Sequence, residues 1–482
     1  MDGKKPDIMT TAAGVPIADN QNSITAGPQG PITLYDVHLF EKIAHFNRER
    51  IPERVVHAQG AGAYGVFTAT SDIERFTKAK VFTKGEATEV FARFSTVAGE
   101  RGSAETQRDV RGFALKFYTR EGNWDMVGIN TPVFFIRDPL KFPDFIHSQK
   151  RCPRTNLHSS TMVWDYFSLS PESLHQVTIL FSDRGIPSTF RHMDGFGSHT
   201  FSFINCEEQR FWVKFHFKSL QGIENLTNSE ASQLAGIDPD FYTRDLFNAI
   251  EAKNYPKWRV GVQIMPEADA EKYYVNPFDV TKVWKFRDYP LIEIGLLEIN
   301  RNTKNYFAEV EQAAFSPANL PPGIGLSPDK MLQGRSMAYA DAQRHRVGGN
   351  VNLLPVNCPH AAAARNYLRD GRMRFDNNGG DGPNYEPNSF GGPVDDSSYA
   401  EPLSNYTGPI GHYKPDPEDC YTQPRDLFRL LDPDHQERLF HNIADSLAGV
   451  DSKIQQRQIE LFGKVDPKYG EGVARALKER KG

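Results

Sequence analysis

One tyrosine and two arginines, spaced as on a helix, are the residues of this chain most suited to chemistry. Arg335 precedes Tyr339 by one helical turn and Arg346 follows it by about two turns, so the three share a face. Such a tyrosine can bind a metal as phenolate, with Arg335 favouring the charged oxygen and Arg346 holding an anionic group of the same cofactor. The alternative is a buried tyrosine hydrogen-bonded to a neighbour, and this stretch alone favours that alternative.

The flanking residues predict the helix that carries this face. Ser327 and Pro328 are typical of a helix start, and Gly348 and Gly349 of a helix end. On the helix between them, one face holds Met331, Arg335, Tyr339, Ala342 and Arg346.

A histidine far upstream is the second candidate. His57 lies in FNRERIPERVVHAQGAG, residues 46–62, shortly after Pro52 and within a run of small residues. Histidine can accept and return a proton near neutral pH, but a single histidine at the entry of a strand is more often structural. Neither candidate decides the function by itself.

Taken together, the two segments resemble the haem catalases. Residues 46–62 match the family's distal-histidine segment, and the helix matches its proximal R-x-F-x-Y-x-D signature except that Met337 replaces Phe. The resemblance covers essentially the whole chain, through TAAG at 11, RFSTVAGERGSAET at 93, RDVRGFALKFYT at 108, FFIRDP at 134, FIHSQKR at 145, SLHQV at 173, FSDRGIP at 181, NPFDVTKVW at 276, NYFAEVEQAAF at 305, PGIGLSPDKMLQGR at 322 and PVNCP at 355.

The chain is similar to the monofunctional haem catalases of the small-subunit type, and this resemblance implies a function. Hydrogen peroxide would be disproportionated to water and dioxygen at haem b, through an oxyferryl intermediate, in protection against oxidative stress. Tyr339 would bind the iron, and His57 would be the proton shuttle, its tautomer fixed by Ser95. The resemblance assigns haem contacts to Arg54, Arg93, Phe142, Arg335 and Arg346. It also places Phe135 and Phe145 in the apolar wall of the pocket, and Val97 and Asp109 in the channel.

One position departs from the family. The family reads G-N-N-T-P, and its first Asn helps to bind peroxide, whereas this chain has Gly128, Ile129, Asn130, Thr131 and Pro132. Neighbouring strand residues point to opposite faces, so Asn130 does not simply inherit the role of Ile129's position. A bulge could turn Asn130 inward, a water could substitute, or His57 could act alone. Asn130 is kept here as a candidate catalytic residue.

The resemblance also suggests a second cofactor, since many small-subunit catalases bind NADPH at the surface. The chain matches that site at His175, Ser182, Arg184, Lys218 and Trp284, and also at Asp194 and Val283. Phe286 stands where the NADPH-binding members often have His. The alternative is a cluster kept for folding after cofactor binding was lost, and the sequence does not decide between the two.

Two other functions fit part of the pattern. A fatty-acid hydroperoxide isomerase on the same barrel also uses a tyrosinate haem, but it lacks most of the C-terminal segments found here. A haem storage or transport protein would explain Tyr339 and the arginines but not His57 with Ser95. Oxygen evolution from peroxide, measured beside a lipid hydroperoxide assay, separates the three functions.

Strand patterns predict the element that positions these residues. They fall at Ala63–Thr70, Thr88–Thr96, Gly112–Thr119, Trp124–Ile136, His199–Asn205, Arg210–Phe217, Trp258–Met265 and Leu291–Asn300. In FWVKFHF, residues 211–217, apolar and polar side chains alternate. We expect an α+β fold with a closed, eight-stranded antiparallel β-barrel, which agrees with the family fold.

The remaining segments are expected around this barrel. Residues 350–423 are rich in Gly, Pro and Asn but also in aromatic residues, which favours an ordered arm wrapped on the domain or on another subunit over a disordered linker. Apolar stripes after residue 423 predict C-terminal helices. The expected division is an N-terminal arm (1–56), the barrel with the distal pocket (57–302), a wrapping segment with the Tyr339 helix (303–423) and a helical region (424–482).

Composition limits the partners. A formal net charge of -5, without a basic tract, gives no reason to expect nucleic acid or an anionic membrane. The four cysteines are far apart, which fits a reducing compartment, and the first residues lack an apolar stretch of signal length. We therefore expect a cytoplasmic protein, and the family suggests a homo-oligomer, a tetramer.

Overall fold

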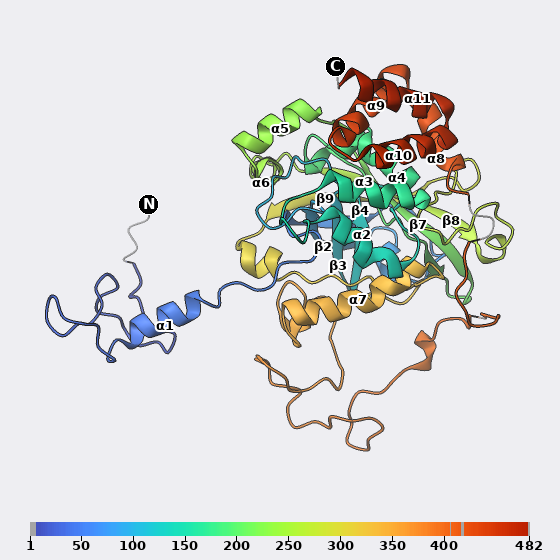
Figure 1. Cartoon of the computed structure of the whole chain (residues 1–482). Helices are drawn as coiled ribbons and strands as arrows, with labels where there is room; N and C mark the ends of the chain where they lie inside the picture. The colour runs from blue at the N-terminus through green and yellow to red at the C-terminus, as the bar shows by residue number, and fades with distance from the viewer. Residues whose placement is uncertain (1–5, 405, 416–418, 481–482) are drawn as a thin grey trace. The chain divides into compact units, whose positions relative to one another are not determined.

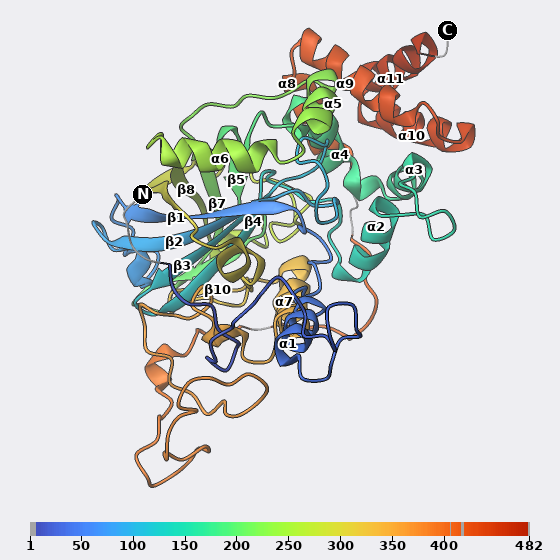
Figure 2. The ribbon, with the colours of Figure 1, turned by 90° about the vertical axis from the view of Figure 1, so that its left-hand side faces the viewer.

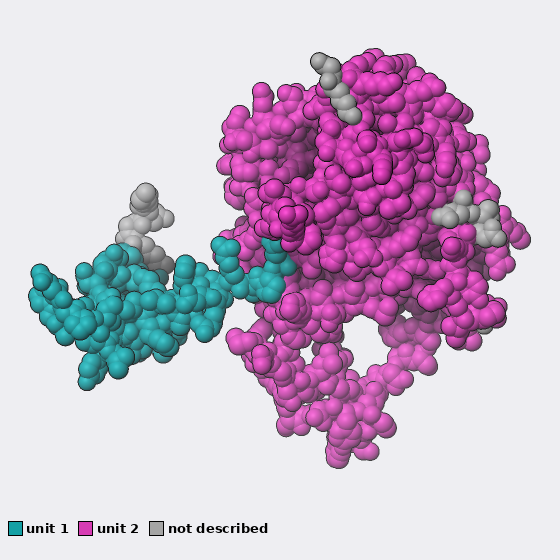
Figure 3. Space-filling view, viewed as in Figure 1, with its two compact units in different colours: residues 1–53 teal, residues 54–482 magenta. Residues whose placement is uncertain are grey.

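A closed antiparallel β-barrel forms the centre of the larger part of the chain (Figures 1 and 2). The computed structural model describes residues 6–404, 406–415 and 419–480, so residues 1–5 of the N-terminal stretch considered above lie outside it. The chain divides into two compact units, Met1–Glu53 and Arg54–Gly482 (Figure 3). In the smaller unit, helix α1 (Val37–Phe46) is capped by the Asp36 side chain.

Eight strands close the barrel. Its wall runs through β7 (Arg210–Ser219), β5 (Gly195–Phe196), β4 (Gly122–Ile129), β3 (Gly112–Thr119), β2 (Ala87–Ser95), β1 (Gly60–Ala69), β9 (Ile292–Asn302) and β8 (Lys257–Pro266), and β8 pairs again with β7. Two short strands, β6 (Phe201–Ile204) and β10 (Ile324–Gly325), extend the sheet beside β7. The predicted α+β fold with an eight-stranded barrel is confirmed.

The alternation along β7 separates the barrel core from an outer face. Val213, Phe215 and Phe217 are buried in the core that fills the barrel, as residues 211–217 predicted. Lys214 and His216 point to the other face and line a cavity described below. This pattern explains how one strand can support both the core and a polar site.

Helices pack on more than one side of the barrel (Figures 1 and 2). They are α2 (Phe142–Gln149), α3 (Ser160–Leu169), α4 (Leu174–Phe181), α5 (Asn228–Ile237), α6 (Phe241–Glu251), α7 (Lys330–Arg346), α8 (Thr422–Leu430), α9 (Pro433–Leu447), α10 (Ser452–Val465) and α11 (Pro467–Glu479). The C-terminal helices α8–α11 lie beside α3 and α4 (Figure 2), and they share with α2–α4 a second core that contains Trp164, Phe440 and Phe462. Among the described residues, no helix has both the length and the apolar character needed to span a membrane.

Two predicted boundaries are wrong. The fourth strand ends at Ile129 instead of Ile136, because the chain turns before Pro132, which has no N–H for a ladder. Helix α7 begins after Asp329, whose side chain caps it by accepting a hydrogen bond from the Leu332 N–H. The Ser327 hydroxyl instead donates to the Thr200 carbonyl, so Ser327 is not the cap.

The segment after α7 has little regular structure. Between η8 (Val351–Leu353) and α8, the described residues contain one short 3₁₀ helix, η9 (Ser397–Tyr399). In Figures 1 and 2 this orange segment loops away from the barrel. Several of its aromatic side chains remain largely exposed, including Phe375, Tyr385, Phe390, Tyr399 and Tyr406.

Candidate active site

A cavity of about 250 Å³ brings the two sequence candidates together. His57, just before β1, and Tyr339, on α7, both line it. Ser198, His199 and Arg335 are its other polar side chains among the described residues. Its apolar lining includes Val56, Val97, Val127, Ile129, Phe134, Phe142, Val280 and Met331. A mainly apolar cavity with a few converging polar groups is typical of a ligand or active site.

The His57 backbone is held in an unusual conformation. Its φ is +65°, in the left-handed region that residues other than glycine rarely adopt. The His57 N–H donates to the Val97 carbonyl at 3.1 Å. The His57 carbonyl accepts from Nη1 of Arg93 at 2.7 Å. Such strain persists only where neighbours over-determine the conformation, which is common at functional sites.

The imidazole is equally well placed. His57 Nδ1 lies 2.9 Å from Ser95 Oγ, at the end of β2. Gly112 leaves the space for this contact, because a Cβ there would lie 2.3 Å from Ser95 Oγ and 2.7 Å from His57 Nδ1. Burial, followed by the charges of Arg93, Arg335 and Arg54, lowers the pKa of His57 to about 3. The ring is therefore neutral near pH 7 and able to accept a proton.

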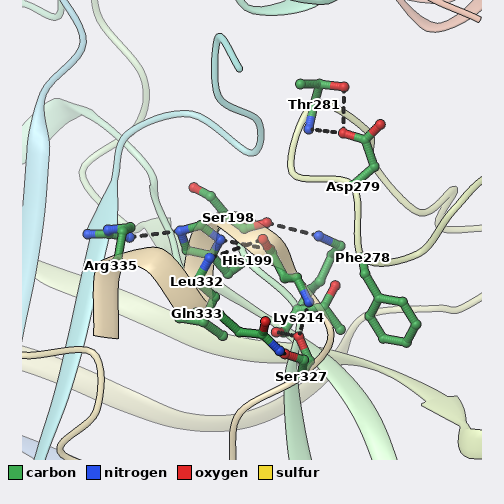
Figure 4. A network of polar contacts seen from close by, with 12 residues as sticks. Ser198, His199, Lys214, Phe278, Asp279, Thr281, Ser327, Leu332, Gln333 and Arg335 are labelled. Carbon is green, nitrogen blue, oxygen red and sulfur yellow. Dashed lines mark hydrogen bonds and ion pairs between the residues drawn. The ribbon is translucent and has the colours of Figure 1, made fainter. Parts of the chain in front are cut away.

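Tyr339, which lines the same cavity, ends a chain of hydrogen bonds. Arg335 Nη2 donates to the Tyr339 oxygen at 2.9 Å and to the Val127 carbonyl at 2.9 Å. Arg335 Nη1 lies 2.8 Å from His199 Nε2, and His199 Nδ1 lies 2.7 Å from Asp329 Oδ2. Because a guanidinium can only donate, Nε2 must accept, and the proton of His199 is on Nδ1, facing the carboxylate. Figure 4 shows His199 beside Arg335.

Asp329 and His199 are buried and were not identified from the sequence. Burial by itself would raise the pKa of Asp329, but His199, Lys214 and the Leu332 N–H together lower it. Burial lowers the pKa of His199, against the attraction of Asp329. The pair is thus a carboxylate and a neutral imidazole near pH 7. Sequence patterns do not reveal the pair, because His199 and Asp329 lie far apart along the chain and no local pattern connects them.

Three arginines gather around Glu311, at the end of the π-helical turn η7 (Phe307–Glu311). Arg54 and Arg346 lie 3.8 Å and 3.7 Å from its carboxylate and donate to backbone carbonyls of this turn. Arg93 joins them electrostatically, since it lowers the pKa of both. Within this group, three guanidiniums face one carboxylate and leave an excess of two positive charges.

The residues present fit a haem. The Tyr339 oxygen suits an iron ligand, and the apolar walls suit a porphyrin. Buried Arg54 Nη1 and Arg93 Nε have no hydrogen-bond partner among the described residues, and Glu311 Oε2 has none either. Two propionates would balance the excess charge of the arginine group and could take such donors. The arginines themselves are not among the residues that line the cavity, so they would hold a cofactor at its edge.

Position 129 is apolar in the structure as well as in the sequence. Ile129 lines the cavity and pairs with Gly112 in an unshifted β3–β4 register. The Asn130 carboxamide instead accepts from the Arg111 N–H at 2.8 Å. The placement of Asn130 at the catalytic pocket is therefore corrected: no bulge turns its side chain inward, and strand alternation keeps it on the other side.

The aromatic side chains that line the cavity differ in part from those expected. Phe142 lines the cavity as expected, but its neighbour there is Phe134. Phe135 and Phe145 are buried behind them, with ring centroids 4.6 Å apart. The expected channel residues lie together: Val97 lines the cavity, and its N–H donates to Asp109 Oδ2 at 2.7 Å.

A second cavity, of about 710 Å³, lies on the outer face of β7. It is lined by five of the expected cofactor residues, which are His175, Arg184, Lys218, Val283 and Trp284. Ser182 is not in its lining, since its hydroxyl donates to the Ile179 carbonyl at the end of α4. Lys214, Lys285 and Arg429 add positive charge, so the cavity suits an anionic ligand. Buried His216 Nδ1 has no partner among the described residues.

Comparisons with known protein families agree with this geometry. The family model described as catalase matches residues 10–392, and one described as catalase-related immune-responsive matches residues 414–477. A catalase of an Onchocerca volvulus endobacterium is 61% identical, over 97% of this chain and 98% of the relative. Catalase A of Pseudomonas putida is 59% identical, over 98% of each.

Solved structures show the same fold. A structure titled as that of a bacterial catalase is 46% identical, with a TM-score of 0.94, and covers 100% of this chain and 98% of its own. Catalase A from Saccharomyces cerevisiae is 42% identical, with a TM-score of 0.95, over 98% of this chain and 99% of its own.

Proposed function

The chain belongs to the catalase family, and we propose that it binds haem b between His57 and Tyr339 and uses this site for the family's reaction. It decomposes hydrogen peroxide, two molecules of which give two of water and one of dioxygen. We further propose that it is of the small-subunit type and protects the cytoplasm against oxidative stress. Haem iron, when bound, supplies the two-electron redox chemistry that the side chains of the cavity lack.

His57 moves the proton in this proposal. Cleavage of the O–O bond requires that one proton pass from the near oxygen of peroxide to the far one, which leaves as water. With Ser95 Oγ accepting from Nδ1–H, at the observed 2.9 Å, the Nε2 lone pair is left to accept this proton and return it. Burial and the arginines keep the ring neutral, so it is ready to accept.

Tyr339 would hold the iron as phenolate. Arg335 donates to its oxygen, and the guanidinium charge stabilises the anion. An anionic oxygen ligand favours the higher oxidation states of iron, which suits an enzyme that stores oxidising equivalents. Arg54, Arg93 and Arg346 would take the propionates, with Phe142 against the porphyrin.

The observation that carries the proposal is the placement of Tyr339 and His57 on the walls of one apolar cavity. Tyr339→Phe should yield protein with little haem or with an altered axial ligand, because no phenolate remains. His57→Ala should keep haem but react with peroxide at least about 10²-fold more slowly, since the proton shuttle is lost. Haem content, optical spectra and stopped-flow mixing with peroxide measure both. Wild-type spectra and turnover in Tyr339→Phe would exclude Tyr339 as ligand, and an undiminished rate in His57→Ala would exclude His57.

We also propose that the second cavity binds NADPH. Lys218, Arg184 and Lys285 supply positive charge for phosphates, and Trp284 supplies an aromatic face. Lys218→Met should weaken NADPH binding, measured by fluorescence titration, at least about tenfold because a charge-assisted hydrogen bond is lost. Equal affinity of the variant and the wild type would contradict this assignment.

The exposed arm supports a homo-oligomer, which we propose to be a tetramer. Phe390 is 74% exposed, and Leu403 is 93% exposed, so the segment leaves much apolar surface uncovered within one chain. Phe390→Asp should shift the mass measured by light scattering towards smaller species without lowering the stability of the barrel. Ile237→Asp, at an exposed position on α5, is the control and should leave the mass unchanged. A monomeric wild-type protein would contradict the proposal.

A further inference from the structure

Lys214 is a buried lysine that lines the second cavity and contacts Ser198, a residue of both cavities. It lies on β7, is 5% exposed and lines the second cavity. Its Nζ donates to the Ser198 carbonyl at 2.9 Å and lies 5.5 Å from the centre of the Trp284 ring. Lys214 is not part of the barrel core, which contains Val213, Phe215 and Phe217 of the same strand.

Ser198 forms a wall that the two cavities share. It lines both of them, and it is followed directly by His199. Its φ of +59° is unusual for a serine, and its hydroxyl donates to the Thr131 carbonyl at 2.8 Å. Figure 4 shows Ser198, His199, Lys214 and Arg335 as one group. The Lys214 ammonium therefore contacts Ser198, the residue next to His199, and His199 belongs to the chain of hydrogen bonds that ends at Tyr339.

The charge of Lys214 acts on the first member of that hydrogen-bond chain. Lys214 lowers the pKa of Asp329, so the ammonium and the carboxylate attract each other across the buried interior. Burial lowers the pKa of Lys214 to about 8, against the attraction of Asp329 and Asp279, which leaves it mainly charged at pH 7. Charges interact strongly in such surroundings because little water screens them.

We propose that Lys214 is a positioning residue for Tyr339, acting through Asp329, His199 and Arg335, and that an anionic ligand in the second cavity reaches the Tyr339 oxygen through the same ammonium. The inference rests on the proposed haem site. Without the ammonium, Asp329 attracts the Nδ1 proton of His199 more strongly, and Nε2 becomes a better acceptor for Arg335. Arg335 then stabilises the phenolate less, and the phenolate donates more charge to the iron.

A ligand in the second cavity acts in the same direction. A phosphate that accepts from Lys214 neutralises part of its charge, as a substitution would. The effect is reciprocal, because a ligand that changes the ferric–ferrous equilibrium must itself bind with different affinity to the two forms. The second cavity would thus tune the iron site without contact with it.

The first test compares charge-removing and charge-keeping variants of the haem-loaded protein. Lys214→Met should lower the haem reduction potential, by about tenfold in the ferric–ferrous equilibrium or about 59 mV for one electron. Lys214→Arg keeps the charge and should stay at the wild-type value. Lys257→Met is the control, because Lys257 on β8 lines neither cavity and is paired with Glu298 at 2.7 Å. Resonance Raman bands of the iron-bound tyrosinate should shift in Lys214→Met alone.

The second test adds a ligand, and its main readout comes from the wild-type protein. NADP⁺, which cannot donate electrons as a hydride, is added to the wild-type protein while the potential is measured. It should lower the potential in the wild type and leave that of Lys214→Met unchanged. A wild-type potential in Lys214→Met overturns the positioning role, and NADP⁺ binding without a shift, or no binding, overturns the role of the ligand. Failure of the underlying haem site is distinguishable, because the wild type would then take up no haem.

Discussion

The proposed proton shuttle, His57, depends on a residue without a side chain. Gly112 faces both Ser95 and His57. A methyl group on Gly112 would lie 2.3 Å from Ser95 Oγ and 2.7 Å from His57 Nδ1, so there is no room for one. Ser95 and His57 can form their hydrogen bond only because Gly112 on β3 has no side chain between them. The hydrogen bond that orients His57 is thus a consequence of packing between β2 and β3.

Gly112→Ala tests this dependence. The added Cβ would displace Ser95 Oγ or the imidazole, and a shift of about 1 Å in a catalytic group can cost about 10²-fold in rate. We expect a slower reaction with peroxide in stopped-flow spectra, with haem content preserved. Gly236→Ala, on α5, is the control, because a Cβ there meets nothing within 4 Å. An unchanged rate in Gly112→Ala would show that the contact of Ser95 with His57 is not needed.

Ile129 gives a second prediction at the scale of one residue. Ile129→Asn should place a donor in the cavity that His57 also lines. It should raise the rate of the first peroxide reaction by about 10- to 10²-fold, since one preorganised donor is commonly worth this much. Haem content should not change. Asn130→Ala should leave that rate alone but cost about 1–3 kcal/mol of stability, because the buried Arg111 N–H loses its side-chain acceptor. Stopped-flow rates and thermal unfolding of both variants check this; the reverse pattern would place Asn130 at the site.

Single residues were predicted best where a motif carried them. His57, Arg335 and Tyr339 line one cavity, and Ser95 contacts His57 at 2.9 Å. Asp329 and His199 were missed, because a hydrogen bond between distant segments leaves no local pattern. The resemblance placed Phe135 in the wall of the pocket, but Phe134 lines the cavity and Phe135 is buried behind it.

At the scale of elements, the residue that caps helix α7, Asp329, also belongs to the hydrogen bonds behind Tyr339. Asp329 Oδ1 accepts from the Leu332 N–H at 3.1 Å, while Oδ2 faces His199. One carboxylate therefore fixes the start of the helix and the orientation of the group behind Arg335. The position of Tyr339 along the helix and the polarity of its hydrogen bonds are set by the same residue.

Asp329→Asn and Asp329→Ala separate these two roles. Asn keeps the cap but removes the charge that faces His199 and Lys214, so the tyrosinate Raman bands should shift and stability should fall by about 1–3 kcal/mol. Ala removes both and should cost a further 0.5–2 kcal/mol, roughly, in thermal unfolding. Asp451, the cap of α10, provides the matched pair, because Asp451→Asn and Asp451→Ala should change stability alone. Identical Raman bands in Asp329→Asn and the wild type would remove Asp329 from the chain of hydrogen bonds.

Strand positions were predictable because period-two alternation is a local property. Each predicted range overlaps one strand of the sheet, although His199–Asn205 is β6, which extends the sheet beside β7 and does not close the barrel. The alternation at residues 211–217 correctly assigned the two faces of β7. The closing pair β7–β8 and the short strands β5 and β10 were not predictable from such patterns. Strand order depends on which segments meet in space, and two-residue strands have no period to detect.

At the scale of the whole molecule, buried histidines connect the site to acid stability. Burial lowers the pKa of His57 and His216 to about 3 and that of His175 to about 4. Between its pKa in the folded protein and its ordinary pKa of about 6.5, each histidine is neutral in the folded state and takes up a proton on unfolding. Lowering the pH through this window therefore favours the unfolded state, by up to about 1.4 kcal/mol per pH unit for each histidine. The raised pKa values of Glu105 and Asp109 act in the opposite sense.

Acid sensitivity should therefore decrease when one of these histidines is replaced by a residue that cannot be protonated. His216 suits the test, because it faces the second cavity and bonds Gln263 at 3.0 Å, away from His57 and Tyr339. His216→Gln should reduce the stability lost between pH 7 and pH 5 by about 2 kcal/mol, even if it lowers stability at pH 7. His441→Gln is the control, because His441 is exposed and paired with Glu437 on α9. Unfolding by heat at both pH values measures the difference; a loss in His216→Gln as large as in the wild type would mean that His216 is already protonated in the folded protein at pH 5.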